Sequence, residues 1–446
     1  MNKNTKKWVA LLGAVCFGAM TLAGCGSGAA TSTTAAPAAS AAPAASEAPA
    51  PAATAAPAAT GKKSTGQGIT DTEVIVGNSA ATSGAYAPVG VPFIAGIQAY
   101  FDMVNDAGGI DGRKVTFNHI TDDEFDPAKG KAALANLVED AKVFAIVGHF
   151  GTPVVAATVD DLKEYGIPAV YFATGIGQLY ADHATTNEEG YNIFPVQPIY
   201  RTEGKIMVAY GVGKFGAKKI GIIHTNDDAG SDLYKGATEQ IKALGNVEVV
   251  DAQVAAGAAD VSAAVTSIKN ANVDFIIVAS IQGTMPTIVK ELANQSVNKD
   301  CITTYVNVSS AMSDAVSTEI QGKFDVYGLG WVAYDDPTVL EAYQKWAPDE
   351  YANNTYAQTG WIAGSFFCEG LRRLEGKEVS WETYMDALQN GGPVKNPFGG
   401  YIDYSDGKRL GTQEMNLSKV VPKSDANPSG WELIAPLAGI NDLLNQ

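Results

Sequence analysis

The chain is poor in the residues and motifs on which most enzyme and metal sites depend. Its 446 residues include four cysteines and four histidines, without a Cys-x-x-Cys pair or a His-Glu-x-x-His motif. The phosphate-binding loop Gly-x-x-x-x-Gly-Lys-Ser/Thr and the nucleophile turn Gly-x-Ser-x-Gly are also missing. These absences exclude the commonest zinc, nucleotide and hydrolase signatures. We therefore expect no enzymatic activity, no metal and no cofactor.

Positive charge is scarce as well. The 31 lysines and arginines stand against 48 acidic residues, which gives a net charge of −17 at pH 7. Without a basic patch, the chain offers little to the phosphates of a nucleic acid. We therefore exclude nucleic acid as a partner.

The N-terminus has the organisation of an export signal. Cationic residues 1–7 precede an uncharged apolar run at 8–22, which is shorter than the ~20 residues of a membrane span. This order predicts a signal peptide over 1–24. Leu-Ala-Gly-Cys at 22–25 resembles the bacterial lipobox, whose cysteine receives a diacylglycerol thioether and an N-acyl chain such as palmitate. Cys25 is thus expected to anchor the protein to the extracellular or periplasmic face of the cell membrane. The alternative is an ordinary signal peptide with a chance cysteine.

Residues 25–68 are expected to form an Ala/Pro-rich tether. Between residues 26 and 60, Glu47 is the only charge and no aromatic residue occurs. Such a segment cannot bury enough apolar surface to offset the entropy of ordering.

Two cysteines follow the tether. Cys301 lies in an apolar run typical of a strand, and Cys368 lies in a run with helical spacing. In an exported chain, a disulfide between them is one alternative. We interpret them as two buried free thiols.

Apolar runs alternate with helical patterns along residues 69–446. This alternation predicts parallel sheets covered on both faces, and the length indicates an α/β fold with two doubly wound lobes. Strands are expected at 74–77, 115–120, 144–148, 169–173, 219–224, 247–250, 275–279 and 302–306. Helices are expected at 92–106, 127–141, 153–165, 202–214, 231–244, 260–270 and 284–294. Asp126 before Pro127 predicts a capped helix start, and Gly108-Gly109 predicts a helix end.

Three patterns suggest chemistry but have simpler explanations. Gly-Val-Gly-Lys-Phe-Gly at 211–216 matches a dinucleotide motif, yet it precedes a strand, so we interpret it as a helix terminus. The acidic runs at 121–126 and 225–232 lack the spacing of a calcium loop and suit helix caps, although the second also leaves a strand and could serve function. The histidines are interpreted as hydrogen-bonded residues of strand ends and loops: His119, His149, His183 and His224.

The loops that leave the expected strands share a composition. In open parallel sheets such loops converge on a crevice. Here they are rich in Ser, Thr, Gly and Asn and pair no nucleophile with a base: 79–88, 148–153, 172–177, 225–230, 280–284 and 306–310. Hydrogen-bond donors without a nucleophile and base beside them suit a site that binds a molecule reversibly.

The run from Asn105 to Arg113, within residues 95–130, resembles extracellular binding proteins of the leucine/isoleucine/valine-binding type. The similarity continues at 145–157, 165–175, 194–204 and 218–236. These proteins are substrate-binding subunits of ABC importers with the type I periplasmic-binding-protein fold. The resemblance implies two lobes joined by three hinge crossovers, near Gln197, Gly330 and Gly399. Lobe I would comprise 69–197 plus 331–398, and lobe II would comprise 198–330 plus 399–446.

The resemblance also implies which residues bind. The family's hydroxyl for the ligand carboxylate falls on Thr152, which could also cap the following helix before Pro153. The next contact falls on residues 173–175, with Thr174 the expected side chain. The expected ligand-binding residues are Thr82, Ser83, Tyr86, Phe150, Gly151, Thr152, Ala173, Thr174, Gly175, Tyr200, Asp227, Asp228, Gln282 and Asn307.

Lobe II departs from the family pattern. Asn307 stands where amino-acid binders carry an acid for the ligand ammonium, and Ile281 or Gln282 replaces a tyrosine. Either Asp227 or Asp228 supplies the negative charge, or the ligand lacks an ammonium. In the second case it could be a small carboxylate, an aromatic acid, an amide or a nucleoside-like compound. Aromatic residues that either wall the site or serve packing are Tyr86, Phe150, Tyr200, Trp331 and Tyr334.

The expected function is that of a lipid-anchored solute-binding protein. It would bind an amino acid or small carboxylate between the lobes and deliver it to ABC permease subunits. One alternative is a sensing lipoprotein that presents its solute to a membrane receptor. Another is an exported α/β enzyme, which would need a nucleophile turn or cofactor loop that the sequence lacks.

Overall fold

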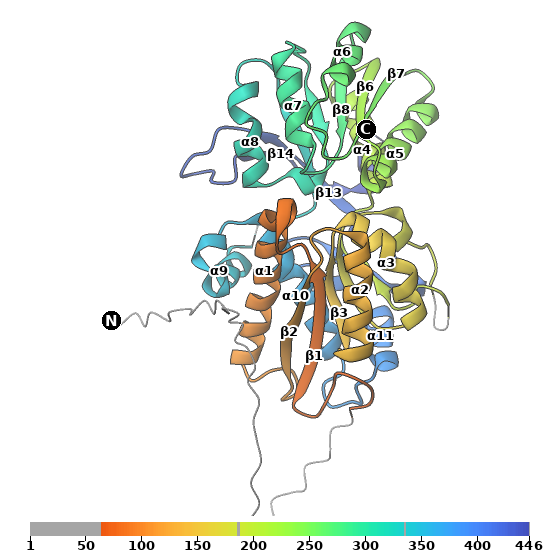
Figure 1. The fold of residues 1–446 in the computed structure, drawn as a ribbon, viewed down its shortest axis with the longest axis vertical. Coiled ribbons are helices and arrows are strands. Elements are labelled where there is room, and N and C mark those ends of the chain that lie inside the picture. Colours follow the sequence, from red (N-terminus) through yellow and green to blue (C-terminus); the bar gives the residue numbers. More distant parts are fainter. Residues whose placement is uncertain (1–63, 185–187, 334–335, 446) are drawn as a thin grey trace, which may run out of the picture. The chain divides into compact units, whose positions relative to one another are not determined.

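The computed structural model describes residues 64–184, 188–333 and 336–445 (Figure 1). The expected signal peptide, Cys25, most of the tether and Tyr334 lie outside the described residues. The last tether residues contact the fold. The Thr65 N–H donates to the Val379 carbonyl at 3.0 Å, and Gln67 Nε2 donates to the Val143 carbonyl at 3.0 Å. Contacts with the fold therefore begin before residue 69.

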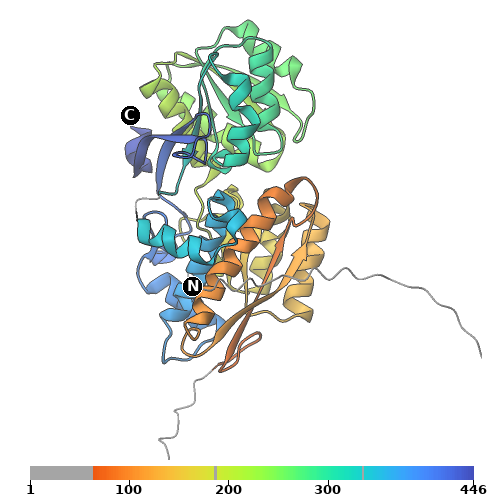
Figure 2. The same cartoon turned by 90° about the vertical axis from the view of Figure 1, so that its left-hand side faces the viewer.

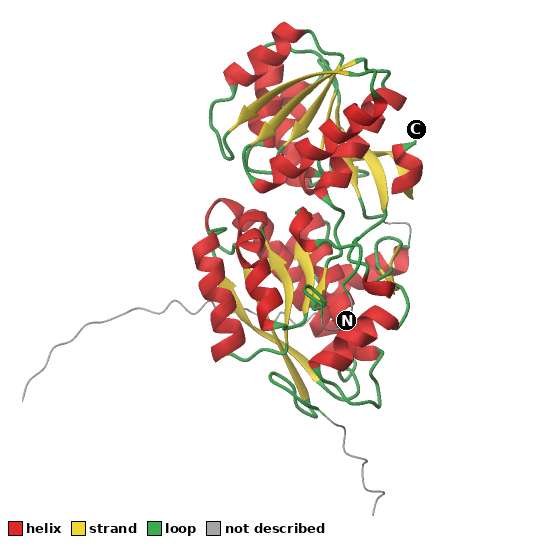
Figure 3. Ribbon diagram, turned by 90° about the vertical axis from the view of Figure 1, so that its right-hand side faces the viewer, coloured by secondary structure: helices red, strands yellow, loops and turns green. Residues whose placement is uncertain are grey.

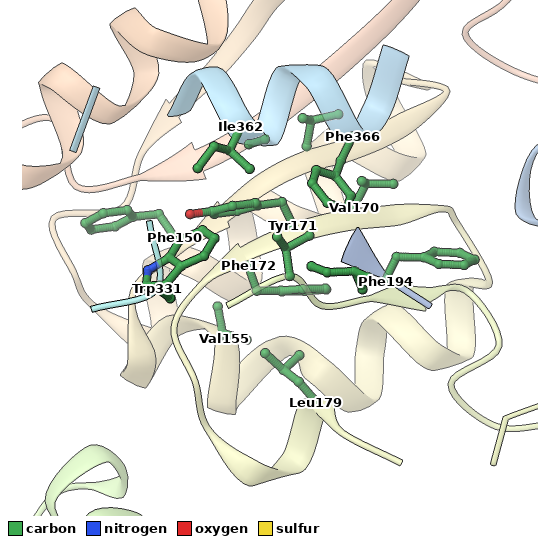
Figure 4. Packing of buried hydrophobic residues seen from close by; sticks show 14 of the residues in the cluster. Phe150, Val155, Val170, Tyr171, Phe172, Leu179, Phe194, Trp331, Ile362 and Phe366 are labelled. Atoms are coloured by element: carbon green, nitrogen blue, oxygen red, sulfur yellow. The ribbon is translucent and has the colours of Figure 1, made fainter. Parts of the chain in front are cut away.

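Five parallel strands form the first sheet, in the order β2-β1-β3-β4-β5. Its strands are β1 (Glu73–Ala80), β2 (Lys114–Asp122), β3 (Ala145–Phe150), β4 (Ala169–Ala173) and β5 (Ile193–Phe194). Its helices are α1 (Ala87–Asp106), α2 (Pro127–Ala135), α3 (Thr152–Tyr165), α10 (Thr355–Arg372) and α11 (Trp381–Asn390). Figure 2 shows α1 alongside α10, and the two are in contact. In Figure 4, Phe366 of α10 and Val155 of α3 lie on opposite sides of β4. The central strands β3 and β4 are thus buried on both faces, as is typical of parallel sheets.

Seven strands form the second sheet, in the order β14-β13-β10-β9-β8-β6-β7. They are β6 (Lys219–Thr225), β7 (Glu248–Val254), β8 (Phe275–Ala279), β9 (Cys301–Thr303), β10 (Val326–Gly330), β13 (Glu414–Val420) and β14 (Trp431–Gly439). The five strands from β6 to β10 are parallel, and β13 and β14 extend the edge in antiparallel pairing. Helices accompany this sheet (Figure 3): α4 (Tyr200–Ala209), α5 (Asp228–Leu244), α6 (Ser262–Ala271), α7 (Met285–Asn294), α8 (Ser310–Ile320) and α12 (Ile440–Leu444).

The chain passes between the two sheets three times. It leaves the first sheet after β5 and returns after β10 to form α9 (Pro337–Trp346), α10 and α11. It crosses again after the short hairpin of β11 (Val394–Lys395) and β12 (Tyr401–Ile402) to reach β13. The prediction of two doubly wound parallel-sheet lobes with three crossovers is confirmed.

Two element boundaries differ from the prediction for identifiable reasons. Helix α1 begins at Ala87, because Pro88 suits its first turn and Pro92 is accommodated inside the helix. The strand expected at 302–306 ends at Thr303. The Tyr305 N–H donates to Oε1 of Glu203 at 2.6 Å, so the chain leaves the sheet and forms a short 3₁₀ turn.

The helix-terminus explanation of residues 211–216 and the helix-cap explanation of the acidic run at 121–126 are confirmed. Residues 210–214 continue α4 as a π-helical turn, and Gly216, at φ +68°, ends it before β6. Asp126 Oδ1 accepts from the Ala128 and Lys129 N–H groups at 2.8 and 3.0 Å, which caps α2. Within the described ranges, no group of acidic, histidine or cysteine side chains could hold a metal ion.

Two thiols and one imidazole of the core are uncharged at neutral pH. Cys301 and Cys368 are buried free thiols, and burial raises the pKa of Cys368 to about 12. Burial also lowers the pKa of His149 to about 4, while its Nε2 lies 2.7 Å from Thr158 Oγ1. Residues 84–106, which include α1, are long and apolar enough to span a membrane, but half of that stretch is buried in the fold. A core helix of this kind passes the same test.

Candidate ligand-binding site

A cavity of about 330 Å³ is lined by residues of both sheets and of the crossings between them. Elements of the first sheet contribute Tyr86, Val89, Phe93, Phe125, Phe150, Gly151, Thr152, Ala173, Thr355, Tyr356 and Thr359. The second sheet contributes Ile281, Gln282, Tyr305, Val306, Val308, Asn416, Ser418, Trp431, Leu433 and Leu437, among others. The crossings contribute Gln197, Tyr200, Gly330, Trp331, Val332 and Ala333. Its size falls within the range of small-molecule sites.

Three hydroxyls gather where β3 and β4 end. Thr152 Oγ1 lies 2.9 Å from Thr174 Oγ1, and the Tyr200 hydroxyl is hydrogen-bonded to both threonines. Thr152 and Tyr200 line the cavity, whereas Thr174 is buried behind them. Burial raises the pKa of Tyr200 to about 12, so its hydroxyl keeps its proton at neutral pH and can donate.

The backbone before α3 needs glycine. Gly151 has φ +92°, and a Cβ there would come within 2.6 Å of the Phe125 ring. The chain can therefore bring Thr152 to the cavity as the first residue of α3. The expectation that Thr152 caps this helix is wrong, because Gly151 occupies the cap position and no side chain caps the helix.

Aromatic rings form much of the cavity wall. Tyr86 and Phe125 are stacked with centroids 3.7 Å apart, and Phe150 lies 6.2 Å from Phe125. Trp331 and Tyr305 meet edge to face at 6.4 Å. Figure 4 shows Phe150 and Trp331 close together. Rings that already pack against one another hold a preformed apolar wall.

A hydrogen-bonded relay ties the first crossing to both sheets. Gln197 Nε2 donates to the Tyr171 hydroxyl of β4, and the Tyr305 hydroxyl donates to Gln197 Oε1, each at 2.8 Å. Tyr171 has φ +64°, a strained conformation for a bulky residue. Such a backbone conformation persists where the surroundings hold the residue in place. The Tyr171 side chain is fully buried, and its hydroxyl accepts from the amide of Gln197 beside the cavity.

Glu203 lies buried near this relay and was not predicted from the sequence. Its carboxyl accepts from Thr304 Oγ1 at 2.7 Å and from the Tyr305 N–H at 2.6 Å. Burial raises its pKa to about 8, although the hydrogen bonds from Thr304 and Tyr305 act in the opposite direction. The sequence signal was slight: one acid in the first turn of an amphipathic helix, where exposed acids are common.

The predicted residues of the second sheet separate into two groups. Gln282 lines the cavity and donates from Nε2 to the Val306 carbonyl at 2.9 Å. Asn307 is fully buried outside the lining, where Nδ2 donates to the Ser280 carbonyl at 2.8 Å and to Thr303 Oγ1 at 2.7 Å. Asp227 caps α5: its Oδ1 accepts from the Gly230 N–H at 2.9 Å. Asp228 follows in the first turn of α5.

The remaining predicted residues of the first sheet lie around the cavity. Tyr86, Phe150, Gly151 and Ala173 line it. Thr82 and Ser83 do not line the cavity. Their backbone N–H groups donate to Asp122 Oδ1 at 2.9 and 3.2 Å. The Gly175 carbonyl accepts from the Tyr200 N–H at 2.8 Å, which positions α4.

Sequence reasoning missed the contribution of β13 and β14. Asn416, Ser418, Trp431 and Leu433 of these strands line the cavity. The alternation of polar and apolar residues at 414–420 could have indicated a half-buried strand, but nothing local shows which sheet it would join. The two strands complete a cavity that the parallel strands alone would leave open.

The fold and this cavity define a class: a two-sheet α/β protein that holds a small molecule where strand ends and interlobe crossings meet, as in type I periplasmic binding proteins. Comparison with known proteins agrees. A family model for periplasmic binding proteins matches residues 73–426. The chain belongs to this family, in its leucine/isoleucine/valine-binding-protein-like branch.

Individual relatives are distant but span most of the fold. The Leu/Ile/Val-binding protein homolog 1 of Brucella suis is 25% identical over 337 residues, which cover 73% of this chain and 85% of the relative. A fatty acid ABC transporter substrate-binding protein from Thermomonospora curvata superposes with a TM-score of 0.73 at 18% identity, covering 85% of this chain and 96% of that one. A branched-chain amino acid ABC transporter structure from Thermus thermophilus with bound valine gives 0.71 at 16% identity, covering 84% and 99%. At such identities the structures establish the fold alone.

Proposed function

We propose that the chain is the lipid-anchored solute-binding subunit of an ABC importer and binds an amino-acid-like or small carboxylate solute without altering it. The observation that carries this proposal is the cavity to which both sheets and their crossings contribute. The curated relatives support it, since they are named as binding proteins for leucine, isoleucine and valine.

The cavity suggests how binding is communicated. A solute that touches both sheets has more contacts when they approach each other, so it favours that arrangement by its differential affinity. The permease would then distinguish loaded from empty protein by the relative position of the lobes. For the lobes we keep the proposed boundaries, 69–197 plus 331–398 and 198–330 plus 399–446.

The polar end of the solute is proposed to lie against Thr152 and Tyr200. Their hydroxyls can turn to donate to a carboxylate, and the first turn of α3 adds a favourable dipole. The remaining wall offers mainly apolar contact.

The experiment that tests this proposal is the substitution Thr152→Val, which keeps the shape and removes the hydroxyl. We expect solute affinity to fall by about 1–2 kcal/mol, the scale of a hydrogen bond to a charged group, with less effect on stability. Isothermal titration calorimetry of the purified protein measures it. Thr318→Val, on an exposed position of α8, is the matched control. Unchanged affinity in Thr152→Val would place the solute elsewhere.

An uptake assay in cells distinguishes an importer subunit from a sensing protein. Deleting the chain should abolish uptake of the radiolabelled solute if it serves an importer. Uptake that persists while a transcriptional response to the solute is lost would favour the sensing alternative.

A further inference from the structure

The cavity wall carries no charge among the residues that the structure describes. Its lining side chains are aromatic, aliphatic, hydroxyl or amide groups, and Asp, Glu, Lys, Arg and His are absent from the described lining. A free amino acid brings an ammonium as well as a carboxylate. An ammonium that leaves water without an anionic partner is strongly disfavoured.

The amides of the wall do not replace that partner. The NH₂ groups of Gln197, Gln282 and Asn416 donate within the protein, and their carbonyl oxygens are neutral acceptors that supply no negative charge to an ammonium. Gln197 Oε1 in turn accepts from the Tyr305 hydroxyl. The hydroxyls of Thr152 and Tyr200 bond to each other and to Thr174, and they can turn to donate to an anion.

Two acids close to the wall already accept hydrogen bonds within the protein. Asp227, which lies close enough to influence the Tyr86 hydroxyl, accepts from Thr225 Oγ1 at 2.6 Å and caps α5. Glu203 lies behind Tyr305 and accepts from two protein donors. Neither lines the cavity.

The rest of the cavity suits an apolar body. Stacked Tyr86 and Phe125, together with Phe150 and Trp331, present ring faces and edges on one side. Leu433 of β14 lines the other side and is 57% exposed, although most large apolar side chains of the fold are buried. An apolar solute would cover this surface and gain from its burial.

We propose that the solute is an apolar monocarboxylic acid, aromatic or branched, that carries no ammonium group. This inference rests on the proposed function, because it assumes that the cavity is the solute site. It narrows that function from amino-acid-like solutes in general to acids whose single charge faces Thr152 and Tyr200.

Matched pairs of probes test the inference. 3-Phenylpropanoate and L-phenylalanine share one skeleton and differ by the ammonium group, as do 4-methylpentanoate and L-leucine. 3-Phenylpropan-1-amine carries the ammonium alone. Binding to the purified protein is measured by calorimetry and by the fluorescence of Trp331 and Trp431, which line the cavity. We expect at least one of the two acids to bind roughly 100-fold more tightly than its amino acid, since the ammonium loses its solvation without a partner.

The outcomes separate the two proposals. If an amino acid binds as tightly as its matched acid, the inference is overturned, while a solute-binding protein remains and Thr152→Val should still weaken that binding. If neither acid binds, the proposed solute class is wrong. If calorimetry shows that Thr152→Val and Tyr200→Phe each bind an acid as tightly as the wild-type protein does, the acid lies outside the proposed site. Both proposals then fail.

A second variant tests the charge argument directly. Gln282→Glu introduces a carboxylate on the wall, and Gln282→Met removes the same amide without adding charge. The acid should bind about tenfold more weakly to the Glu variant than to the Met variant, because like charges repel across a poorly solvated cavity. Equal affinities for the acid in the two variants would overturn the inference. Far-ultraviolet circular dichroism verifies that both variants are folded.

Discussion

At the scale of single residues, Glu203 makes the stability of the fold depend on pH. Its folded pKa of about 8 lies above the ordinary value of 4.5, so the folded protein keeps a proton that the unfolded chain has already lost. Stability therefore falls as pH rises between these two values. His149 acts in the opposite sense: its pKa of about 4 lies below 6.5, so stability falls as pH drops through that interval. Below pH 6.5 the two groups change stability in opposite directions. Between pH 6.5 and 8, Glu203 changes stability with pH and His149 does not.

The first prediction follows from this window. Glu203→Gln resembles the protonated acid in shape and cannot ionise, so it should flatten the loss of stability between pH 6.5 and 8. Urea unfolding at several pH values measures the slope. Glu164→Gln, an exposed position of α3, should keep the wild-type slope. A Glu203→Gln slope equal to that of the wild type would show that another group titrates there.

The residues around the cavity show what a single sequence can reveal. Thr152 was expected from the family resemblance, and Tyr86 and Tyr200 were expected as aromatic wall residues; all three line the cavity. Asn307 was also expected to bind the ligand. Its amide instead donates to the Ser280 carbonyl and to Thr303 Oγ1, and the residue does not line the cavity. Which way a side chain turns at a strand end depends on partners far along the chain, and the sequence does not disclose them.

At the scale of elements, the capping of α5 yields the second prediction. Asp227→Ala should destabilise the protein by about 1 kcal/mol, since the Gly230 N–H loses its acceptor. Asp227→Asn should retain most of the stability, because asparagine also caps well. Chemical unfolding compares the two variants. Equal losses in both would mean that the charge matters more than the cap.

The same variants address the open question about Asp227. If its carboxylate paired with a solute ammonium, Asp227→Asn would weaken binding without changing stability. We expect solute affinity to be unchanged in Asp227→Asn, as measured by calorimetry.

Elements with local signals were well predicted. The strands β3 and β4 are short, mostly apolar runs, α2 begins at its Asp-Pro cap, and residues 361–371 have the helical spacing found in α10. The predicted strand at β9 was too long because the carboxyl group of Glu203, 102 residues earlier in the sequence, accepts from the N–H of Tyr305. β13 and β14 were not predicted, because antiparallel pairing to β10 depends on a return of the chain that no local pattern encodes.

At the scale of the whole molecule, attachment to the membrane yields the third prediction. Cys25→Ser removes the sulfur that would carry the thioether lipid, so the protein should appear in the soluble extracellular or periplasmic fraction. Stable anchoring needs two acyl chains, and both are proposed to depend on this cysteine. Fractionation and immunoblotting measure the distribution. Cys301→Ser, at a buried thiol, should leave the protein with the membrane. Wild-type retention of Cys25→Ser would refute acylation there.

Solute binding should also stabilise the whole fold, because the cavity draws on both sheets. This is the fourth prediction. At a free concentration 100 times the dissociation constant, a solute that binds the folded state alone adds about 2.7 kcal/mol. A thermal-shift series with 3-phenylpropanoate and L-phenylalanine would therefore rank them in the order of their affinities. A stabilisation that did not saturate with concentration would indicate weak, unspecific contact instead.

The two thiols enclosed in the core have a practical consequence. Cys301 and Cys368 are inaccessible in the native fold, and the Cys25→Ser form adds no other cysteine after the expected signal. A pair of cysteines engineered on the surface, one beside each sheet, would thus react selectively with fluorescent maleimides while the native thiols stay in place. Energy transfer between the dyes would then report, in real time, how far the two halves move when a solute arrives.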